Sequence, residues 1–364
     1  MIEGLAIFAF AFLGLRILIA LVNAVGPARL RGSDLSHEAL VSVLIPARNE
    51  AGQLPDLLKG LALQYHNNLE IIVYDDNSED ETWDVIQRFV TEDSRVRSVK
   101  GLSLPAGWLG KNHACHQLAL NAKGDYLLFL DADVRTGPSI ITDLLTHSKG
   151  HNLDLLSVFP VQQMLTMGEL ISVPLMNRIL VSLLPLPLSR LSKMSSLSAA
   201  NGQCMFFKAA SYHAQHFHHW LKEESVEDIR ISREMKRLGM RTEVLLSDGQ
   251  IQCRMYTGYL EAVKGFARNF HHFFGKSEVA MCVFGVWTSL APVITGIVFG
   301  LSGLLAYLAG TLGLQALVSR ASQFPLLQQL WLMPLQHMAM LHIMAAGIYY
   351  RKRGKLEWKG RRIS

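Results

Sequence analysis

The sequence is poor in cysteine and in charged residues, and both shortages limit the kinds of protein it can encode. Only 18% of its 364 residues are charged and 50% are hydrophobic, which fits one domain of ordinary size plus membrane segments. The cysteines show no paired spacing, so neither a disulfide framework nor a zinc site is indicated; they are Cys115, Cys204, Cys253 and Cys282. The formal net charge of +5 lies mostly in a basic C-terminal tail, so we expect no nucleic-acid partner.

Two common nucleotide-binding loops are also missing. The first β-branched run, Val41–Ile45, is followed by neither Gly-x-Gly-x-x-Gly nor the Walker sequence. This absence argues against a nicotinamide enzyme and against a P-loop kinase. The histidines at 213–219 invite a metal interpretation, but a polar helix or loop face explains them at least as well.

Long apolar runs lie near both ends of the chain. Leu5–Val25 is close to the roughly 20 residues that cross a bilayer. It lacks a positive leader and a convincing cleavage site, so residues 1–26 are predicted to be an uncleaved transmembrane anchor. A second apolar region, residues 279–350, contains two candidate spans, Val279–Leu312 and Pro325–Tyr350. Buried core helices are the alternative interpretation.

The distribution of basic residues predicts the orientation of these spans. Residues 351–364 form a strongly basic tail, and Arg29 and Arg31 follow the first apolar run closely. Positive charge is enriched on the cytoplasmic side of membranes, so we expect both the tail and the central domain to be cytoplasmic. This requires an even number of C-terminal spans. Two is the simplest count, with residues 313–324 as the outer loop.

Strand-like and helix-like segments alternate in the middle of the chain. Short apolar runs predict strands at Val41–Ile45, Leu69–Tyr74, Arg95–Val99 and Tyr126–Leu130. This alternation predicts a parallel sheet with helices on both faces. Ligands bind such sheets at the carboxyl ends of the strands, where this sequence places several polar groups.

The fourth of these strands ends on two carboxylates, Asp131 and Asp133. Residues two apart in an extended segment share a side, so these two acids would lie together. Two carboxylates this close repel each other unless a cation lies near them, and oxygen ligands suit Mg²⁺ or Mn²⁺. The alternative is a solvated turn after the strand.

Four ordered motifs resemble the family-2 glycosyltransferases with a GT-A fold. They are Val-Ser-Val-Leu-Ile-Pro-Ala-Arg-Asn-Glu from Val41, Ile-Ile-Val-Tyr-Asp-Asp-Asn-Ser from Ile71, Gly-Trp-Leu-Gly-Lys from Gly107, and Leu-Phe-Leu-Asp-Ala-Asp from Leu128. The resemblance implies a cytoplasmic GT-A domain over residues 38–270 with a mixed, mainly parallel sheet. The flanking spans look like the membrane-attached branch that includes carotenoid-acid and hopanoid-associated glycosyltransferases.

The resemblance also implies roles for single residues. Pro46, Ala47, Arg48 and Glu50 would line the base and ribose of a sugar nucleotide, which Asp75 or Asp76 would also contact. Lys111 would approach the base or the diphosphate, although a solvated lysine is the alternative. Asp131 and Asp133 would hold Mg²⁺ or Mn²⁺ on the diphosphate, and a UDP-sugar is the most plausible donor.

The acceptor side is predicted around Asp228. Residues 225–239 have apolar residues at helical spacing, which places Glu227 and Asp228 in the first turn. There the helix dipole favours the ionised form that a base needs, and the pair resembles the family's Glu-Asp motif, whose Asp is the base. Acids that only complement the helix dipole are the alternative. Gly202 resembles part of the family's loop under the acceptor site.

One motif departs from the family pattern. Processive members carry Gln-x-x-Arg-Trp near the end of the domain, whereas this chain has Gln252-Cys-Arg254-Met-Tyr256. Arg254 remains a candidate for contact with the diphosphate, but a long polymer product is not expected.

Two apolar segments suggest contact with the bilayer surface. Residues 168–194 are crowded with apolar residues but interrupted by prolines, which fits an interfacial segment beside the acceptor site; an ordinary core insertion is the alternative. Phe266, Phe270 and Phe273, with Lys264 and Arg268, suggest a second amphipathic approach.

These features together predict an inverting, metal-dependent glycosyltransferase. It would be a multi-pass protein of the cell membrane that moves one sugar from a nucleotide-diphosphate sugar to a lipid or isoprenoid acceptor of carotenoid or hopanoid type. Transfer to a polyprenyl phosphate, which needs no base, is the alternative within enzymes. A catalytically silent protein that binds sugar nucleotides is the alternative outside them.

Overall fold

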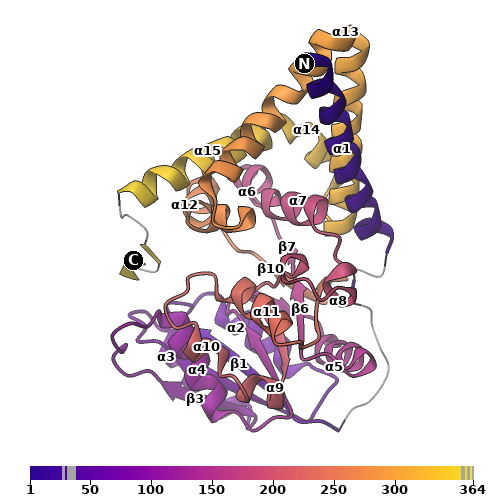
Figure 1. Cartoon of the computed structure of the whole chain (residues 1–364). Helices are drawn as coiled ribbons and strands as arrows, with labels where there is room; N and C mark the ends of the chain where they lie inside the picture. The colour runs from indigo at the N-terminus through magenta and orange to yellow at the C-terminus, as the bar shows by residue number, and fades with distance from the viewer. Residues whose placement is uncertain (27–28, 31–37, 354–356, 359–360, 363–364) are drawn as a thin grey trace.

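The structure is a computed structural model that describes residues 1–26, 29–30, 38–353, 357–358 and 361–362 (Figure 1). Its strands are β1 (Val41–Ala47), β2 (Leu69–Asp75), β3 (Val96–Lys100), β4 (Tyr126–Leu130), β5 (Val134–Thr136), β6 (Leu155–Phe159), β7 (Val161–Gln162), β8 (Cys204–Lys208), β9 (Thr242–Leu246), β10 (Ile251–Cys253), β11 (Glu357–Trp358) and β12 (Arg361–Arg362). Its α-helices are α1 (Ile2–Val25), α2 (Leu54–Ala62), α3 (Thr82–Glu92), α4 (Gly110–Asn121), α5 (Ile140–His151), α6 (Met167–Ser172), α7 (Pro174–Leu183), α8 (Leu188–Leu191), α9 (Ala209–His213), α10 (Phe217–Trp220), α11 (Glu227–Arg237), α12 (Tyr259–Asn269), α13 (Glu278–Ser322), α14 (Leu326–Trp331) and α15 (Met333–Lys352).

The central sheet is mixed and mainly parallel, as predicted. Its strand order is β3-β2-β1-β4-β8-β6-β9, and β8 runs antiparallel to both of its neighbours, β4 and β6. The parallel strands β1, β2 and β4 are buried on both faces, which explains why they read as continuous apolar runs instead of alternating ones. Because β1 and β2 pair in register, Ala47 lies beside Asp75 at the carboxyl end of the sheet.

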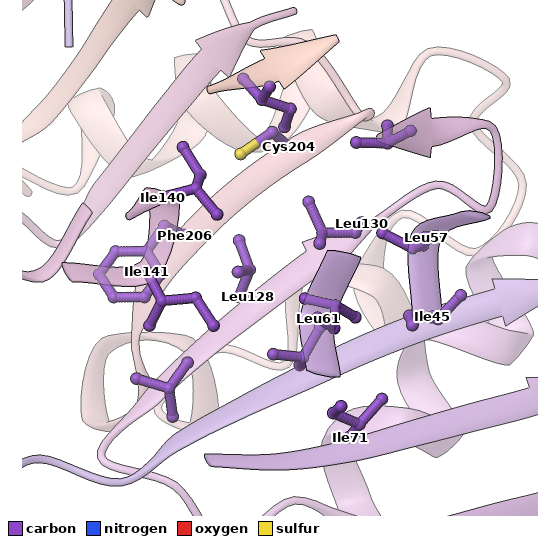
Figure 2. Packing of buried hydrophobic residues seen from close by; sticks show 14 of the residues in the cluster. Ile45, Leu57, Leu61, Ile71, Leu128, Leu130, Ile140, Ile141, Cys204 and Phe206 are labelled. Atoms are coloured by element: carbon purple, nitrogen blue, oxygen red, sulfur yellow. The ribbon is translucent and has the colours of Figure 1, made fainter. Parts of the chain in front are cut away.

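A compact apolar core fixes the position of these strand ends. Side chains of β1, β2, β4 and β8 meet those of α2 and α5 on one face of the sheet, as Figure 2 shows for Ile45, Leu61, Leu128, Ile141 and Phe206. All of these side chains are buried. The carboxyl edge of the sheet is therefore a rigid platform for the groups that follow each strand.

A small second sheet brings a distant part of the chain to this edge. Strand β10 pairs antiparallel with β5, which places Cys253 opposite Val134, and it pairs in parallel with β7. The segment after β10 therefore lies close to the paired aspartates, although more than a hundred residues separate them in the sequence.

Two of the described helices, α1 and α13, are long and apolar enough to cross a membrane by length and composition. They pack side by side and project away from the sheet domain (Figure 1). Aromatic contacts tie α1 to both parts of α13: Phe8 meets Trp287, with ring centroids 5.1 Å apart, and Phe10 meets Tyr307 at 5.8 Å.

The predicted outer loop at residues 313–324 is wrong. Helix α13 continues to Ser322, and the chain reverses earlier, at Gly300 (φ 68°, ψ −160°), so α13 folds back on itself (Figure 1). Glycine tolerates this left-handed φ, and apolar residues continue on both sides of it. Hydropathy alone therefore could not locate the reversal.

The second predicted C-terminal span has a different environment from the first. Helix α15 covers most of residues 325–350, but it does not reach the hydropathy of α1 or α13. It packs mainly against α12 and also contacts α6 and α13, and it leans away from α1 (Figure 1).

The apolar segment at residues 168–194 folds into α6, α7 and α8. Helix α7 contacts α1 and α13, and it buries Leu175, Ile179, Leu180 and Val181. Most of its apolar surface is therefore covered by other helices. Exposed apolar side chains in this segment are confined to its flanks, at Met167, Leu188, Leu191 and Met194.

Candidate active site

A cavity of about 700 Å³ opens at the carboxyl ends of β1, β2 and β4. Its walls come from the sheet edge, from α4 and α11, and from α12 on the side of the long helices. The predicted site residues that line it are Pro46, Ala47, Arg48, Glu50, Asp76, Lys111, Asp131, Asp133, Gly202, Glu227 and Asp228. The fold thus brings together groups from six separate stretches of the sequence.

Two predicted site residues do not line the cavity. Asp75 is buried at the end of β2, where its Oδ1 accepts a hydrogen bond from the Ser78 backbone N–H at 3.2 Å. Arg254 instead forms an ion pair with the buried Glu169 of α6, with 2.8 Å between Nη2 and Oε1. Of the two acids at the end of β2, the structure therefore places only Asp76 at the cavity.

Arg48 connects the ends of β1 and β2. Its Nη1 donates to the backbone carbonyls of Asp76 and Asn77 at 2.7 and 2.9 Å, and its Nη2 lies 3.3 Å from Glu79. The guanidinium therefore holds the loop after β2 against the loop after β1, which shapes this end of the cavity.

Lys111 lies between two carboxylates in the centre of the site. Its Nζ is 2.8 Å from Asp131 Oδ1 and 3.3 Å from Glu227 Oε1. Burial alone would lower the pKa of Lys111, but Asp131 and Glu227 outweigh this effect and hold the pKa well above its usual value. Lys111 is therefore a fixed positive charge that contacts both the aspartate pair and the α11 acids.

Asp133 is the more deeply placed member of the aspartate pair. Burial, together with repulsion from Asp131 and Glu50, raises the pKa of its carboxyl to about 7. Within the described part of the chain, its Oδ1 is buried without a hydrogen-bond partner. A divalent cation would satisfy that oxygen and offset the repulsion, so the donor set fits Mg²⁺ or Mn²⁺.

Asp228 lies at the start of α11 and faces the same cavity. Its Oδ2 accepts a hydrogen bond from the Gly202 N–H at 2.9 Å. Burial and the neighbouring Glu227 raise the pKa of Asp228 to about 7, which opposes the ionised form that the helix dipole was expected to favour. Desolvation in a closed site outweighs the field of one helix end. A pKa near neutrality suits a general base.

Helix α12 supplies cavity residues that the sequence did not assign to the site. Lys264 and Arg268, one helical turn apart on α12, line the cavity together with Tyr256, which precedes the helix. The amphipathic pattern of α12 was visible in the sequence, but it suggested a membrane approach. Only the packing of α12 against α6 and α15 places these cations on the cavity wall.

Trp108 also lines the cavity, within the Gly-Trp-Leu-Gly-Lys motif. Its ring stacks on His116, with centroids 5.4 Å apart, and contacts His113 and His219. The histidines at 213–219 thus take part in ring packing behind this loop. Among the described residues, a group of three side chains close enough to share a metal ion lies elsewhere and consists of His147, His151 and Glu243.

The fold and the cavity together define a GT-A-like domain. Residues 42–207 match the family described as glycosyl transferase family 2. This part of the chain is therefore a family 2 glycosyltransferase domain, which confirms the predicted resemblance.

Two relatives of known activity are similar to parts of this chain. Over 232 residues the chain is 26% identical to the 4,4'-diaponeurosporenoate glycosyltransferase of Staphylococcus haemolyticus. This alignment covers 63% of this chain and 60% of that protein. The chain is 35% identical over 94 residues to the UDP-Glc:alpha-D-GlcNAc-diphosphoundecaprenol beta-1,3-glucosyltransferase WfaP of Escherichia coli, covering 26% of this chain and 35% of that protein. The alignments therefore span less than two thirds of either relative.

A solved structure shares the fold over almost the whole chain. The mannosyltransferase PcManGT of Pyrobaculum calidifontis, determined with GDP-Man and Mn²⁺, superposes with a TM-score of 0.57. The match covers 97% of this chain and 99% of that chain at 15% identity. At this identity the likeness establishes the fold alone.

Proposed function

We propose that this protein is a membrane-bound glycosyltransferase that moves one sugar from a nucleotide-diphosphate sugar to a lipid-soluble acceptor, with inversion. The observation that carries the proposal is the meeting of Asp131, Asp133, Lys111 and Asp228 in one cavity. The relatives support it, since one is named for a carotenoid-acid acceptor and another for a diphosphoundecaprenol acceptor.

The donor side would occupy the sheet edge. Pro46, Ala47, Arg48 and Asp76 would receive the base and ribose, with a UDP-sugar as the proposed donor. Asp131 and Asp133 would hold Mg²⁺ or Mn²⁺, which supplies positive charge against the diphosphate. Lys111 adds a fixed charge at the same place, and such preorganised charges stabilise the leaving diphosphate.

The acceptor side would face α11. In the reaction, the acceptor oxygen forms a bond to the anomeric carbon while the bond from that carbon to the diphosphate oxygen breaks. Attack from the face opposite the leaving group inverts the anomeric centre. Asp228 would accept the proton of a hydroxyl acceptor, and the Gly202 N–H fixes its carboxylate for that role. A phosphate or carboxylate acceptor is already an anion and would need no base.

The cavity also has an apolar side that suits a lipid-soluble acceptor. Met176, Phe270 and Phe273 line it, and they belong to segments that pack against the long helices. An acceptor dissolved in the bilayer could reach the site along this wall without leaving an apolar environment.

Product analysis tests the proposal directly. The purified full chain in lipid nanodiscs is incubated with Mn²⁺, a panel of nucleotide sugars and extracted isoprenoid lipids. We expect nucleoside diphosphate release and a lipid product heavier by one sugar, detected by mass spectrometry. Binding of a nucleotide sugar without any release of nucleoside diphosphate would favour the silent binding protein.

Membrane topology gives a further prediction. If α13 crosses the bilayer twice with its turn at Gly300, a cysteine introduced at Ser302 in a Cys282→Ser background is labelled by a membrane-impermeant maleimide in intact cells. A cysteine at Gly313 lies inside the second half of α13 and stays unlabelled. A control cysteine at Leu327 is labelled only after permeabilisation. Labelling at Gly313 but not at Ser302 would contradict this topology.

The cations near the donor site can be separated by substitution. We expect Arg268→Gln to raise the KM for the nucleotide sugar about tenfold, because it removes a charged group that could contact the diphosphate. Arg254→Gln is expected to leave this KM nearly unchanged. It should instead lower the unfolding temperature, since it leaves the buried Glu169 without its ion-pair partner. The reverse pattern in steady-state kinetics would restore the sequence-based role of Arg254.

A further inference from the structure

Two arginines lie close together inside the bundle of apolar helices. Arg16 belongs to α1, which is one of the two helices long and apolar enough to cross a membrane, and its side chain is buried. Arg178 belongs to α7, which packs against α1 and α13. The two guanidiniums are near enough to repel each other electrostatically. Charges among apolar helices are costly unless an anion accompanies them.

The partners of Arg16 are all uncharged. Its Nε and Nη2 donate to the Ser182 hydroxyl at 3.2 and 2.8 Å. Its guanidinium also lies over the rings of Phe12 and Phe284, 5.8 and 5.3 Å from their centroids. These contacts hold the guanidinium in place but leave its charge uncompensated.

Arg178 has no anionic partner either. Tyr307 of α13 lies beside both arginines and is the ionisable side chain that favours their charged forms. A tyrosine is neutral at neutral pH, so it supplies no negative charge. His337 of α15 lies near both arginines and shares a hydrogen bond of 2.8 Å with Ser289. Among the residues that the structure describes, no carboxylate pairs with Arg16 or Arg178.

The pair lies on the side of the helix bundle that faces the sheet domain. Arg16 is nine residues before Val25, the end of α1 nearest the sheet domain, which corresponds to about 14 Å along the helix. Helix α7 lies across the base of the long helices, between them and the sheet domain (Figure 1). Both guanidiniums therefore lie in the half of the helix bundle nearer the sheet domain.

We propose that Arg16 and Arg178 form a binding site for the phosphate of an anionic membrane lipid. The planar guanidinium matches the geometry of phosphate oxygens, and basic pockets between membrane helices bind lipid headgroups. The proposal rests on the membrane insertion that is part of the proposed function, but not on the reaction. Because Met176 of α7 lines the cavity, a lipid bound here would also stabilise the apolar wall of the active site.

Lipid retention by the purified full chain tests this site. The protein is transferred from detergent into nanodiscs of phosphatidylcholine with a minor fraction of phosphatidylglycerol, and bound lipid is measured by native mass spectrometry after release. We expect the wild type to retain phosphatidylglycerol in preference to phosphatidylcholine. Arg16→Gln and Arg178→Gln should each weaken this retention about tenfold or more. Arg320→Gln, an exposed arginine near the end of α13, serves as the matched control and should change nothing.

Several results would overturn the proposal. They are equal retention of the two lipids by the wild type, unchanged retention in Arg178→Gln, and displacement of the lipid by inorganic phosphate alone. A preference for a long-chain carboxylic acid over phosphatidylglycerol would assign the site to another anion and count equally against it. If a glutamine variant fails to fold, Arg178→Lys keeps the charge while removing the planar fork, and it should still bind more weakly. No sugar donor is present, so the outcome does not depend on whether the chain transfers sugar.

Discussion

Replacing Asp131 or Asp133 by Asn is expected to lower the kcat/KM of sugar transfer by about 10²- to 10³-fold, the usual effect of losing one preorganised stabiliser of developing charge. Each change removes one carboxylate of the pair that would hold the cation on the diphosphate. Asp133 should be the more sensitive position for metal affinity, because its Oδ1 is buried without a hydrogen-bond partner among the described residues.

The measurement is nucleoside diphosphate release as Mn²⁺ is titrated, together with metal binding by calorimetry in the absence of donor. Asp56→Asn is the matched control, since Asp56 is an exposed aspartate of α2 paired with Arg135, and it should behave like the wild type. Unchanged transfer and unchanged metal binding in both site variants would refute the metal-binding role of the aspartate pair.

Replacing Asp228 by Asn is expected to lower kcat by about 10²- to 10⁴-fold if the acceptor is a hydroxyl, the range typical of a general base. The base must be deprotonated to act, and the pKa of Asp228 is raised to about 7. Wild-type kcat/KM should therefore rise about tenfold per pH unit below pH 7 and level off above it. Asp228→Asn should lose this acid limb.

The acceptor class follows from the same variant. A phosphate or carboxylate acceptor already carries its charge, so Asp228→Asn would retain most of its activity with such a substrate. An acid limb that persists in the variant would show that another group controls the pH dependence.

Stability should change with pH in the opposite direction to activity. The folded chain keeps the Asp228 proton up to about pH 7, whereas the unfolded chain releases it near the ordinary pKa of 3.8. The folded state therefore binds more protons in this interval, so the contribution of Asp228 to the free energy of unfolding decreases as pH rises through it. Thermal unfolding measured from pH 4 to pH 8 should show a smaller decrease for Asp228→Asn than for the wild type.

Much of the fold could be predicted because its signals are local. The apolar runs of β1, β2 and β4 are continuous since both faces of each strand are buried, and the polar groups directly after them occupy one sheet edge. The antiparallel pairing of β8 and the small sheet of β5, β10 and β7 were not predicted. They depend on pairings between segments far apart in the chain, which carry no local pattern.

The sequence by itself determined the four motifs, which contain the aspartate pair and Lys111, and it determined the two acids at the start of α11. Tertiary structure decided which of the remaining polar groups reach the cavity. Arg254 turns to Glu169 because a buried carboxylate requires a cationic partner, while Lys264 and Arg268 enter the cavity through the packing of α12. Burial raises the pKa of Asp228, and contact between helices brings Arg16 close to Arg178. Burial and contact of this kind arise only when segments far apart in the chain pack together.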